Sequence, residues 1–188
     1  MTQAKFDLEI TREDTVYGII QGNETVVFIK AGAGGSHVGY EKKYLKMASA
    51  IHEKDGSTVI CASNPSDEQS KKWDSTLIKE VTSTFTAIPV LKFIGTSRGA
   101  YLGLTHLCEE LPFSKMLLIN MPLMLNFHKS KAALKNKQPT FVYGELDPSA
   151  PYIPFLKNHS TAVVTIPSAD HNFTDMQEEF LALIEYIL

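Results

Sequence analysis

The sequence predicts an α/β fold in which a mostly parallel, twisted sheet is covered by helices on both faces. Short apolar runs rich in β-branched and aromatic residues alternate along the chain with longer segments of helical period. A chain of 188 residues with 44% hydrophobic content is also large enough to bury the core of one such sheet. We therefore expect a single domain over residues 1–188, with about seven or eight strands.

The expected sheet begins with an antiparallel hairpin. Residues 4–10 and 15–21 alternate in hydropathy, as half-buried strands do, and the polar segment 12–14 separates them. The later apolar runs are continuous, which is typical of buried strands in a parallel sheet. These runs lie at residues 25–30, 57–62, 90–95, 115–120, 140–143 and 162–166.

Helices are expected in the longer intervals, where apolar residues recur every three or four positions. Gly56 follows the first interval as a helix stop, and residues 66–69 have the spacing of a capping box ahead of the second. The predicted helices cover residues 40–51, 66–85, 100–108 and 173–187.

Composition and charge exclude several classes of function. The formal charge of −3 argues against a general nucleic-acid-binding protein, which needs a basic footprint. The chain contains neither a signal-peptide pattern nor an apolar stretch long enough to span a membrane. Its two cysteines, Cys61 and Cys108, are not spaced as a metal or redox motif. We expect a cytoplasmic protein without nucleic-acid or membrane partners, without metal or cofactor, and of undetermined oligomeric state.

The segment Gly95-Thr-Ser97-Arg-Gly99 carries the most specific chemical signal, because it connects a predicted buried strand directly to a predicted helix. Such a sharp turn strains its central residue, and flanking glycines relieve the crowding. The turn would present the Ser97 hydroxyl above the edge of the sheet. The alternative is a glycine-rich turn in which Ser97 only caps the helix.

A serine becomes nucleophilic only when a base takes its proton and a third group orients that base. The sequence supplies both at later strand ends. Residues 141–148 run from a strand into a turn with Glu145 and Asp147, and residues 163–171 run from the next strand to Asp170 and His171. The order serine, acid, histidine is that of one class of serine hydrolase.

With these residues in this order, the chain resembles the α/β-hydrolase superfamily over nearly its whole length, without matching one particular family. The resemblance implies Ser97 as nucleophile, Asp147 as orienting acid and His171 as general base. Asp147 is preferred because the acid of the superfamily commonly lies in a G-x-x-D turn, here Gly144 to Asp147. No acid occurs between Glu110 and Glu145, so an acid after the preceding strand is not available.

The glycine-rich segment 32–37 could cradle a phosphate, but it lacks the lysine of a P-loop and the last glycine of a dinucleotide motif. The resemblance implies instead that this loop and the residue after the nucleophile form an oxyanion hole. Ala33 and Arg98 would then donate their backbone N–H groups. Ala31-Gly32 stands where many relatives have His-Gly, which leaves the donor on this loop open.

The substrate pocket is expected near the same edge of the sheet, where open α/β sheets bind ligands. We assign Gly32, His37, Met121 and Met124 to it, with core packing as the alternative for the two methionines. About 20 residues separate Asn120 from Thr140, too few for a lid domain. The site is therefore expected to be open.

These features predict a small, lidless serine hydrolase that cleaves a small-molecule ester or thioester through an acyl-enzyme on Ser97. Two alternatives remain open. The same three residues could serve an acyltransferase or a peptidase. A non-catalytic binding or regulatory protein could also use the fold, and the unusual Ala31-Gly32 pair is compatible with a poorly formed oxyanion hole.

Overall fold

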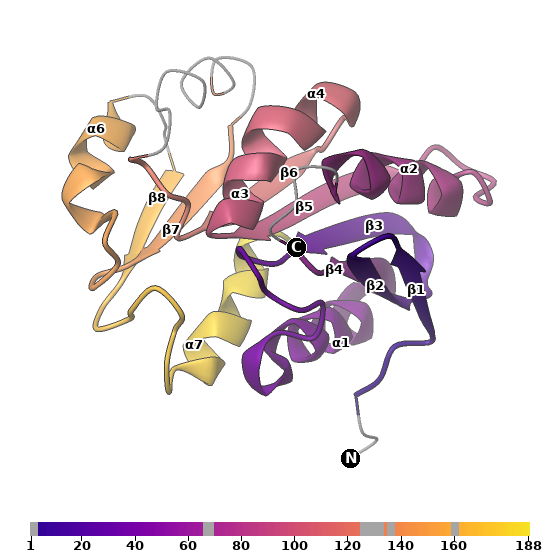
Figure 1. Ribbon diagram of the computed structural model, residues 1–188, viewed down its shortest axis with the longest axis horizontal. Helices are drawn as coiled ribbons and strands as arrows, with labels where there is room; N and C mark the ends of the chain where they lie inside the picture. Colours follow the sequence, from indigo (N-terminus) through magenta and orange to yellow (C-terminus); the bar gives the residue numbers. More distant parts are fainter. Residues whose placement is uncertain (1–3, 66–69, 125–133, 135–137, 159–161) are drawn as a thin grey trace.

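The computed structural model describes residues 4–65, 70–124, 134, 138–158 and 162–188, and the side chains of residues 70–72 lie outside this description. Its eight strands form one sheet in the order β1-β2-β4-β3-β5-β6-β7-β8 (Figure 1). The strands are β1 (Leu8–Arg12), β2 (Thr15–Ile20), β3 (Asn23–Lys30), β4 (Ser57–Ala62), β5 (Val90–Thr96), β6 (Lys115–Ile119), β7 (Thr140–Gly144) and β8 (Ala162–Ile166).

The strand directions confirm the predicted architecture. Strand β1 pairs with β2 and β2 pairs with β4 in antiparallel fashion, and every other pairing in the sheet is parallel. Strand β4 is buried along its whole length, as its continuous apolar run indicates. Because the parallel strands share one direction, the segments that follow β3, β5, β6, β7 and β8 leave the sheet at the same edge.

Helices cover both faces of the sheet (Figure 1). Helices α1 and α7 pack on one face, and α2, α3 and α4 lie on the other. Each of the two groups covers a separate apolar core between the helices and the sheet. The helices are η1 (Tyr40–Lys42), α1 (Lys43–Asp55), α2 (Ser70–Thr82), α3 (Arg98–Leu102), η2 (Gly103–Leu107), α4 (Cys108–Glu110), η3 (Ala150–Tyr152), α6 (Ile153–Lys157), α7 (Gln177–Ala182) and η4 (Leu183–Tyr186).

Two helix ends show how local sequence sets the boundaries. Helix α1 ends at Gly56, which has φ 73° and donates its N–H to the His52 carbonyl at 2.8 Å. The last helix begins later than its apolar stripe predicts. Phe173 and Asp175 have φ values of 56° and 55°, so residues 173–176 form turns, and α7 starts only at Gln177. Phe173 is buried nonetheless, which explains why it fits the periodic pattern.

Some sequence expectations fall outside the described residues. The proposed capping box at residues 66–69 and most of the segment between β6 and β7 are among them. In the part of the chain that is described, no helix is both long and apolar enough to cross a membrane.

Candidate active site

Ser97 occupies the sharp turn between β5 and α3. Its φ of 50° and ψ of −123° are unfavourable for a residue with a side chain, and such strain persists where the surrounding structure enforces it. The flanking glycines have a steric reason. A Cβ on Gly95 would lie 2.5 Å from the Ala100 Cα, and one on Gly99 would lie 2.4 Å from the Ala31 carbonyl oxygen. The turn therefore brings α3 against β5 and the end of β3.

The structure places His171 and Asp147 in line with Ser97. The Nε2 atom of His171 lies 3.0 Å from the Ser97 Oγ, and its Nδ1 atom lies 2.5 Å from the Asp147 Oδ2. An ionised carboxylate can only accept a hydrogen bond, so Nδ1–H donates to Asp147. In the neutral imidazole, Nε2 is then left to accept the Ser97 proton.

Asp147 is held rigidly in the turn after β7. The residue is 3% exposed, and its second carboxylate oxygen accepts the Ser149 N–H at 2.6 Å. Its own N–H donates to the Gly144 carbonyl at 3.1 Å. The Ser149 hydroxyl in turn accepts the Leu123 N–H from the segment after β6, at 3.3 Å. These contacts fix the carboxylate before any substrate is present.

The two competing acids have other partners. Glu145 accepts the Ser168 N–H at 2.9 Å. Asp170 accepts the N–H groups of Asn172 and Thr174, both at 2.9 Å. Hydrogen bonds from Thr174 and its neighbours hold the pKa of the Asp170 carboxyl below its usual range. The geometry thus separates Asp147 from the alternatives that the sequence leaves open.

Asn120 is a buried residue of this site that sequence reasoning missed. It follows β6 with φ 48°, a conformation that asparagine tolerates better than most residues. Its Nδ2 atom donates to the His171 carbonyl at 2.9 Å, and its Oδ1 atom accepts the Gly144 N–H at 2.8 Å. One amide side chain thereby connects the ends of β6 and β7 to the loop after β8 that carries His171, called the histidine loop below.

The glycine-rich loop after β3 borders the nucleophile. A Cβ on Gly32 would lie 3.3 Å from the Ser97 Cβ. Asn64 holds the loop from the end of β4: its Nδ2 donates to the Ala31 carbonyl at 3.0 Å, and its carbonyl accepts the Gly34 N–H at 2.8 Å. Arg98, the second residue assigned to the oxyanion hole, is the first residue of α3.

A buried ion pair lies behind this loop. Lys30, the last residue of β3, is fully buried and places its Nζ atom 2.9 Å from the Asp74 Oδ2 on α2. The same Nζ donates to the Ser63 carbonyl at 2.8 Å, and the Tyr17 hydroxyl donates to Asp74 at 2.9 Å. Burial lowers the pKa of Lys30 and raises the pKa of Asp74.

A cavity of about 280 Å³ opens at the nucleophile. Gly32, Ala33, Ser97 and His171 line it. Its other walls include residues that the sequence analysis did not assign, namely Lys43, Tyr44, Phe173 and Phe180. Lys43 and Tyr44 begin the helix that follows the glycine-rich loop, a position that could have drawn attention to them.

Three residues assigned to the substrate pocket lie elsewhere. His37 binds Glu9 of β1, with 3.0 Å between Nε2 and Oε1, because the loop turns this side chain toward the N-terminal hairpin. Met121 is fully buried in the core, where its carbonyl accepts the Tyr143 hydroxyl proton. Met124 is 58% exposed and lines a separate cavity with Leu123, Tyr152 and Phe155. Gly32, the fourth residue assigned to the substrate pocket, lines the cavity at Ser97.

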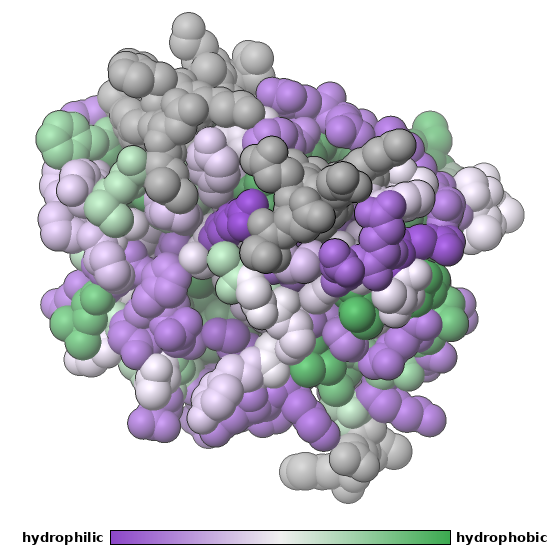
Figure 2. Space-filling view, in the orientation of Figure 1, coloured by the Kyte–Doolittle hydropathy of each residue, from purple (hydrophilic) through white to green (hydrophobic). Residues whose placement is uncertain are grey.

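That separate cavity belongs to an apolar region around α6. Met124 and Phe155 are more than half exposed there, and Figure 2 shows green surface over α6 at the upper left.

In the described part of the chain, no group of three or more histidine, cysteine or acidic side chains could hold a metal ion.

The sheet order and the Ser97 turn define the α/β-hydrolase fold, and comparison with solved structures bears this out. An α/β serine hydrolase homologue from Coxiella burnetii is 12% identical over 97% of this chain and 98% of its own, with a TM-score of 0.71. The protein Est1E from Butyrivibrio proteoclasticus is also 12% identical, over 95% of this chain and 98% of its own, with a TM-score of 0.68.

A lidless protein is among the structural neighbours. An α/β serine hydrolase without lid from Xanthomonas campestris is 15% identical over 91% of this chain and 88% of its own, with a TM-score of 0.60. No protein-family model and no curated protein sequence matches this chain. The likeness therefore rests on the fold, and the chemistry has to be argued from the residues at Ser97.

Proposed function

We propose that the protein is a serine hydrolase that cleaves small or acyl-chain esters or thioesters through an acyl-enzyme on Ser97. The observation that carries the proposal is the hydrogen-bonded line from Ser97 Oγ through both His171 nitrogens to Asp147. A structural serine that only caps a helix has no need of a base oriented by a buried acid. Structural neighbours described as a serine hydrolase homologue, a putative esterase and an esterase domain support the same class of reaction.

In the proposed reaction, Ser97 Oγ attacks the carbonyl carbon of the substrate while its proton moves to His171 Nε2. The tetrahedral intermediate collapses, the bond to the leaving oxygen or sulfur breaks, and His171 returns the proton to that leaving atom. Water then attacks the acyl-enzyme, again giving its proton to His171. The acid departs, and the proton returns to Ser97 Oγ. Asp147 stabilises the protonated imidazole in both halves.

The negative charge on the carbonyl oxygen needs donors that are already in place. We assign this role to the backbone N–H groups of Ala33 and Arg98, one on the loop beside Ser97 and one at the start of α3. A donor of this kind typically contributes about 10²–10³ in rate, because it binds charge that appears only in the transition state. Because these donors are backbone groups, the oxyanion hole does not depend on a histidine at the position of Ala31, where many relatives have one.

A kinetic test replaces Ser97 by alanine and measures turnover of p-nitrophenyl acetate and labelling by a fluorophosphonate. We expect kcat to fall by about 10³-fold or more and labelling to disappear, because the nucleophile is lost. Ser83→Ala is the matched control, since Ser83 is exposed just after α2 and its hydroxyl donates to the Glu80 carbonyl at 2.7 Å. Equal turnover by the wild type and Ser97→Ala would rule the proposal out.

Other functions of the fold give different outcomes. Faster transfer of the acyl group to an added alcohol or amine than to water would indicate an acyltransferase, and cleavage of peptides would indicate a peptidase. Tight binding of a small ester without turnover would indicate a binding protein. A cytoplasmic location and a small-molecule substrate remain part of the proposal.

A further inference from the structure

A second cavity adjoins the one at Ser97 and extends the path that a bound substrate can follow. It has a volume of about 430 Å³ and lies between the start of α1 and the segment from Asn172 to Phe180. Lys43, Asn172, Phe173 and Phe180 line both cavities. A substrate whose ester lies at Ser97 and whose chain extends into this outer cavity therefore passes Lys43.

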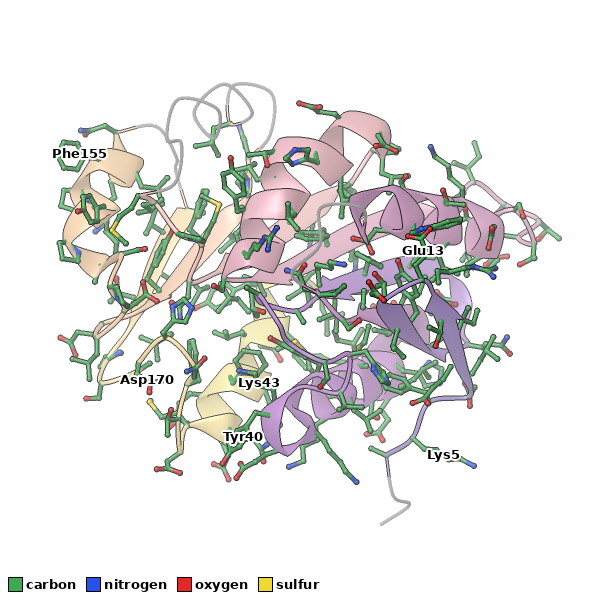
Figure 3. The ribbon with its side chains drawn as sticks, viewed as in Figure 1. Lys5, Glu13, Tyr40, Lys43, Phe155 and Asp170 are labelled. Carbon is green, nitrogen blue, oxygen red and sulfur yellow. The ribbon has the colours of Figure 1, made fainter. Side chains whose placement is uncertain are left out.

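The ammonium group of Lys43 is held at this junction by backbone and aromatic contacts. Its Nζ atom donates to the Asn172 carbonyl at 3.1 Å and lies 4.9 Å from the centre of the Phe180 ring and 5.5 Å from that of Tyr44. Figure 3 shows Lys43, the first residue of α1, on the side of this helix near α7, with Asp170 on the loop that leads to α7. An ammonium group has three donors, and the Asn172 carbonyl occupies one.

Lys43 differs from the other lysines of α1 because its hydrogen-bond acceptor is a backbone carbonyl and not a side chain. Lys46 binds Gln177, and Lys54 pairs with Glu185. Among the described residues, no carboxylate lies within ion-pair distance of the Lys43 Nζ. Burial lowers the pKa of Lys43, and Asp170 opposes this effect from a distance. A half-buried cation without a bound anion, facing a cavity next to a nucleophile, is suited to receive an anion from a ligand.

We propose that Lys43 binds a carboxylate on the substrate, so that the enzyme prefers esters carrying one negative charge in the part that occupies the outer cavity. The apolar rings of Phe173 and Phe180 would contact the hydrocarbon between the ester and the carboxylate. Glu41 and Asp175 line the outer cavity but not the cavity at Ser97, so we expect the carboxylate at Lys43, where the two cavities meet, and expect a second negative charge to be repelled.

The inference rests on the proposed function for its catalytic readout and is tested with two matched substrate pairs. The first pair places the charge on the acyl side: mono-p-nitrophenyl pimelate against its methyl ester. The second places it on the leaving group: 3-acetoxybenzoate against 3-acetoxybenzamide. We expect the wild type to favour the charged member of at least one pair by about 10-fold in kcat/KM, mainly through KM, because a hydrogen bond to a charged group is worth about this much.

Substitutions at Lys43 should change this ratio of charged to neutral kcat/KM. Lys43→Met should abolish the preference, Lys43→Glu should reverse it, and Lys43→Arg should retain it because the charge is kept. Lys54→Met, on the same helix but paired with Glu185, should leave the ratio unchanged. Turnover of both pairs without preference, or a preference that Lys43→Met does not reduce, would overturn the proposal.

A binding measurement separates this inference from the proposed reaction. Calorimetric titration of Ser97→Ala with pimelate monomethyl ester and 3-acetoxybenzoate needs no catalysis. Binding that Lys43→Met weakens by about 10-fold would support the subsite even if no ester is hydrolysed. Binding that is insensitive to Lys43→Met, in a protein that does hydrolyse esters through Ser97, would reject the subsite and leave the proposed reaction intact.

Discussion

Asn120 holds the histidine loop to the sheet, and its removal tests how strongly the site depends on that connection. Asn120→Ala leaves the buried Gly144 N–H without its acceptor and the His171 carbonyl without its closest donor. We expect the free energy of unfolding to fall by about 1–3 kcal/mol. We also expect kcat to fall by about 10-fold or more with little change in KM, because a displaced His171 misaligns proton transfer.

Asn120→Asp serves as the comparison variant. Aspartate tolerates the same positive φ and still accepts the Gly144 N–H, but it cannot donate to the His171 carbonyl. Urea unfolding and separate determination of kcat and KM distinguish a positioning role from a purely structural one. A loss of stability in Asn120→Ala without any loss of kcat would show that Asn120 does not position His171.

Residues with a recognisable local pattern could be located from the sequence, and others could not. Ser97, Asp147 and His171 each follow a predicted strand, and strand ends of a parallel sheet meet at one edge. Asn120 also ends a predicted strand, but its role depends on the His171 carbonyl, 51 residues away, and the role of Lys43 depends on Asn172, 129 residues away. Met121 and Met124 show the reverse error, since an apolar run near the edge does not reveal which side chains turn into the core.

At the scale of elements, the contact between α3 and β3 depends on Gly99. A Cβ at this position would meet two backbone carbonyl oxygens, those of Ala31 and Lys30, at 2.4 and 2.5 Å. We expect Gly99→Ala to lower the free energy of unfolding by about 2–3 kcal/mol, because backbone cannot move aside as a side chain can. Gly34→Ala is the comparison, with φ +68° and open space around the added atom, and should cost about 1 kcal/mol. Equal losses in urea unfolding would contradict this explanation.

A second prediction concerns the buried ion pair between Lys30 on β3 and Asp74 on α2. Lys30→Met leaves the buried Asp74 without its cation and should cost about 3–5 kcal/mol at pH 7. In the wild type, burial raises the pKa of Asp74 above 3.8, and the charge and hydrogen bond of Lys30 partly oppose this effect. Removing Lys30 raises the folded-state pKa further, so the folded variant binds the Asp74 proton more tightly than the folded wild type does. The stability of Lys30→Met relative to wild type should therefore be greatest below about pH 4 and fall as the pH rises.

Denaturation curves at pH 4 and pH 7 measure this difference, with Lys54→Met as a control at an exposed ion pair. We expect the control to change stability by less than about 1 kcal/mol at both values. A Lys30→Met variant as stable as the wild type at pH 7 would mean that Asp74 is not held as a buried charge by Lys30.

Elements with a clear period were predicted closely, whereas boundaries set by tertiary contacts were not. The strands agree with the structure to within a few residues at most ends, and β1 deviates further because its pairing starts at Leu8. The apolar pattern predicts that the last helix begins at Phe173. Phe173 is buried, as the pattern requires, but it lies in a turn with positive φ and not in the helix. Helix α6 and the short η3 before it were not predicted, although each has a proline in its first turn, Pro154 and Pro151, where proline favours the start of a helix.

At the scale of the whole molecule, the arrangement of strands follows from long-range pairing that no local pattern encodes. The sequence indicated a mostly parallel sheet and a hairpin, but it did not indicate that β3 lies between β4 and β5. That placement brings the glycine-rich loop beside Ser97, because both segments leave adjacent strands at the same edge. The carboxyl ends of β3, β5, β6, β7 and β8 thus supply the candidate site in turn.

The proposed reaction requires a covalent acyl-enzyme on Ser97, and mass spectrometry detects this intermediate directly. The purified protein is mixed with a library of acyl esters, quenched in acid, digested and analysed for the peptide that contains Ser97. We predict a mass gain equal to the acyl group on Ser97, absent from Ser97→Ala. The same mass gain in Ser97→Ala, or ester hydrolysis undiminished in that variant, would contradict the claim.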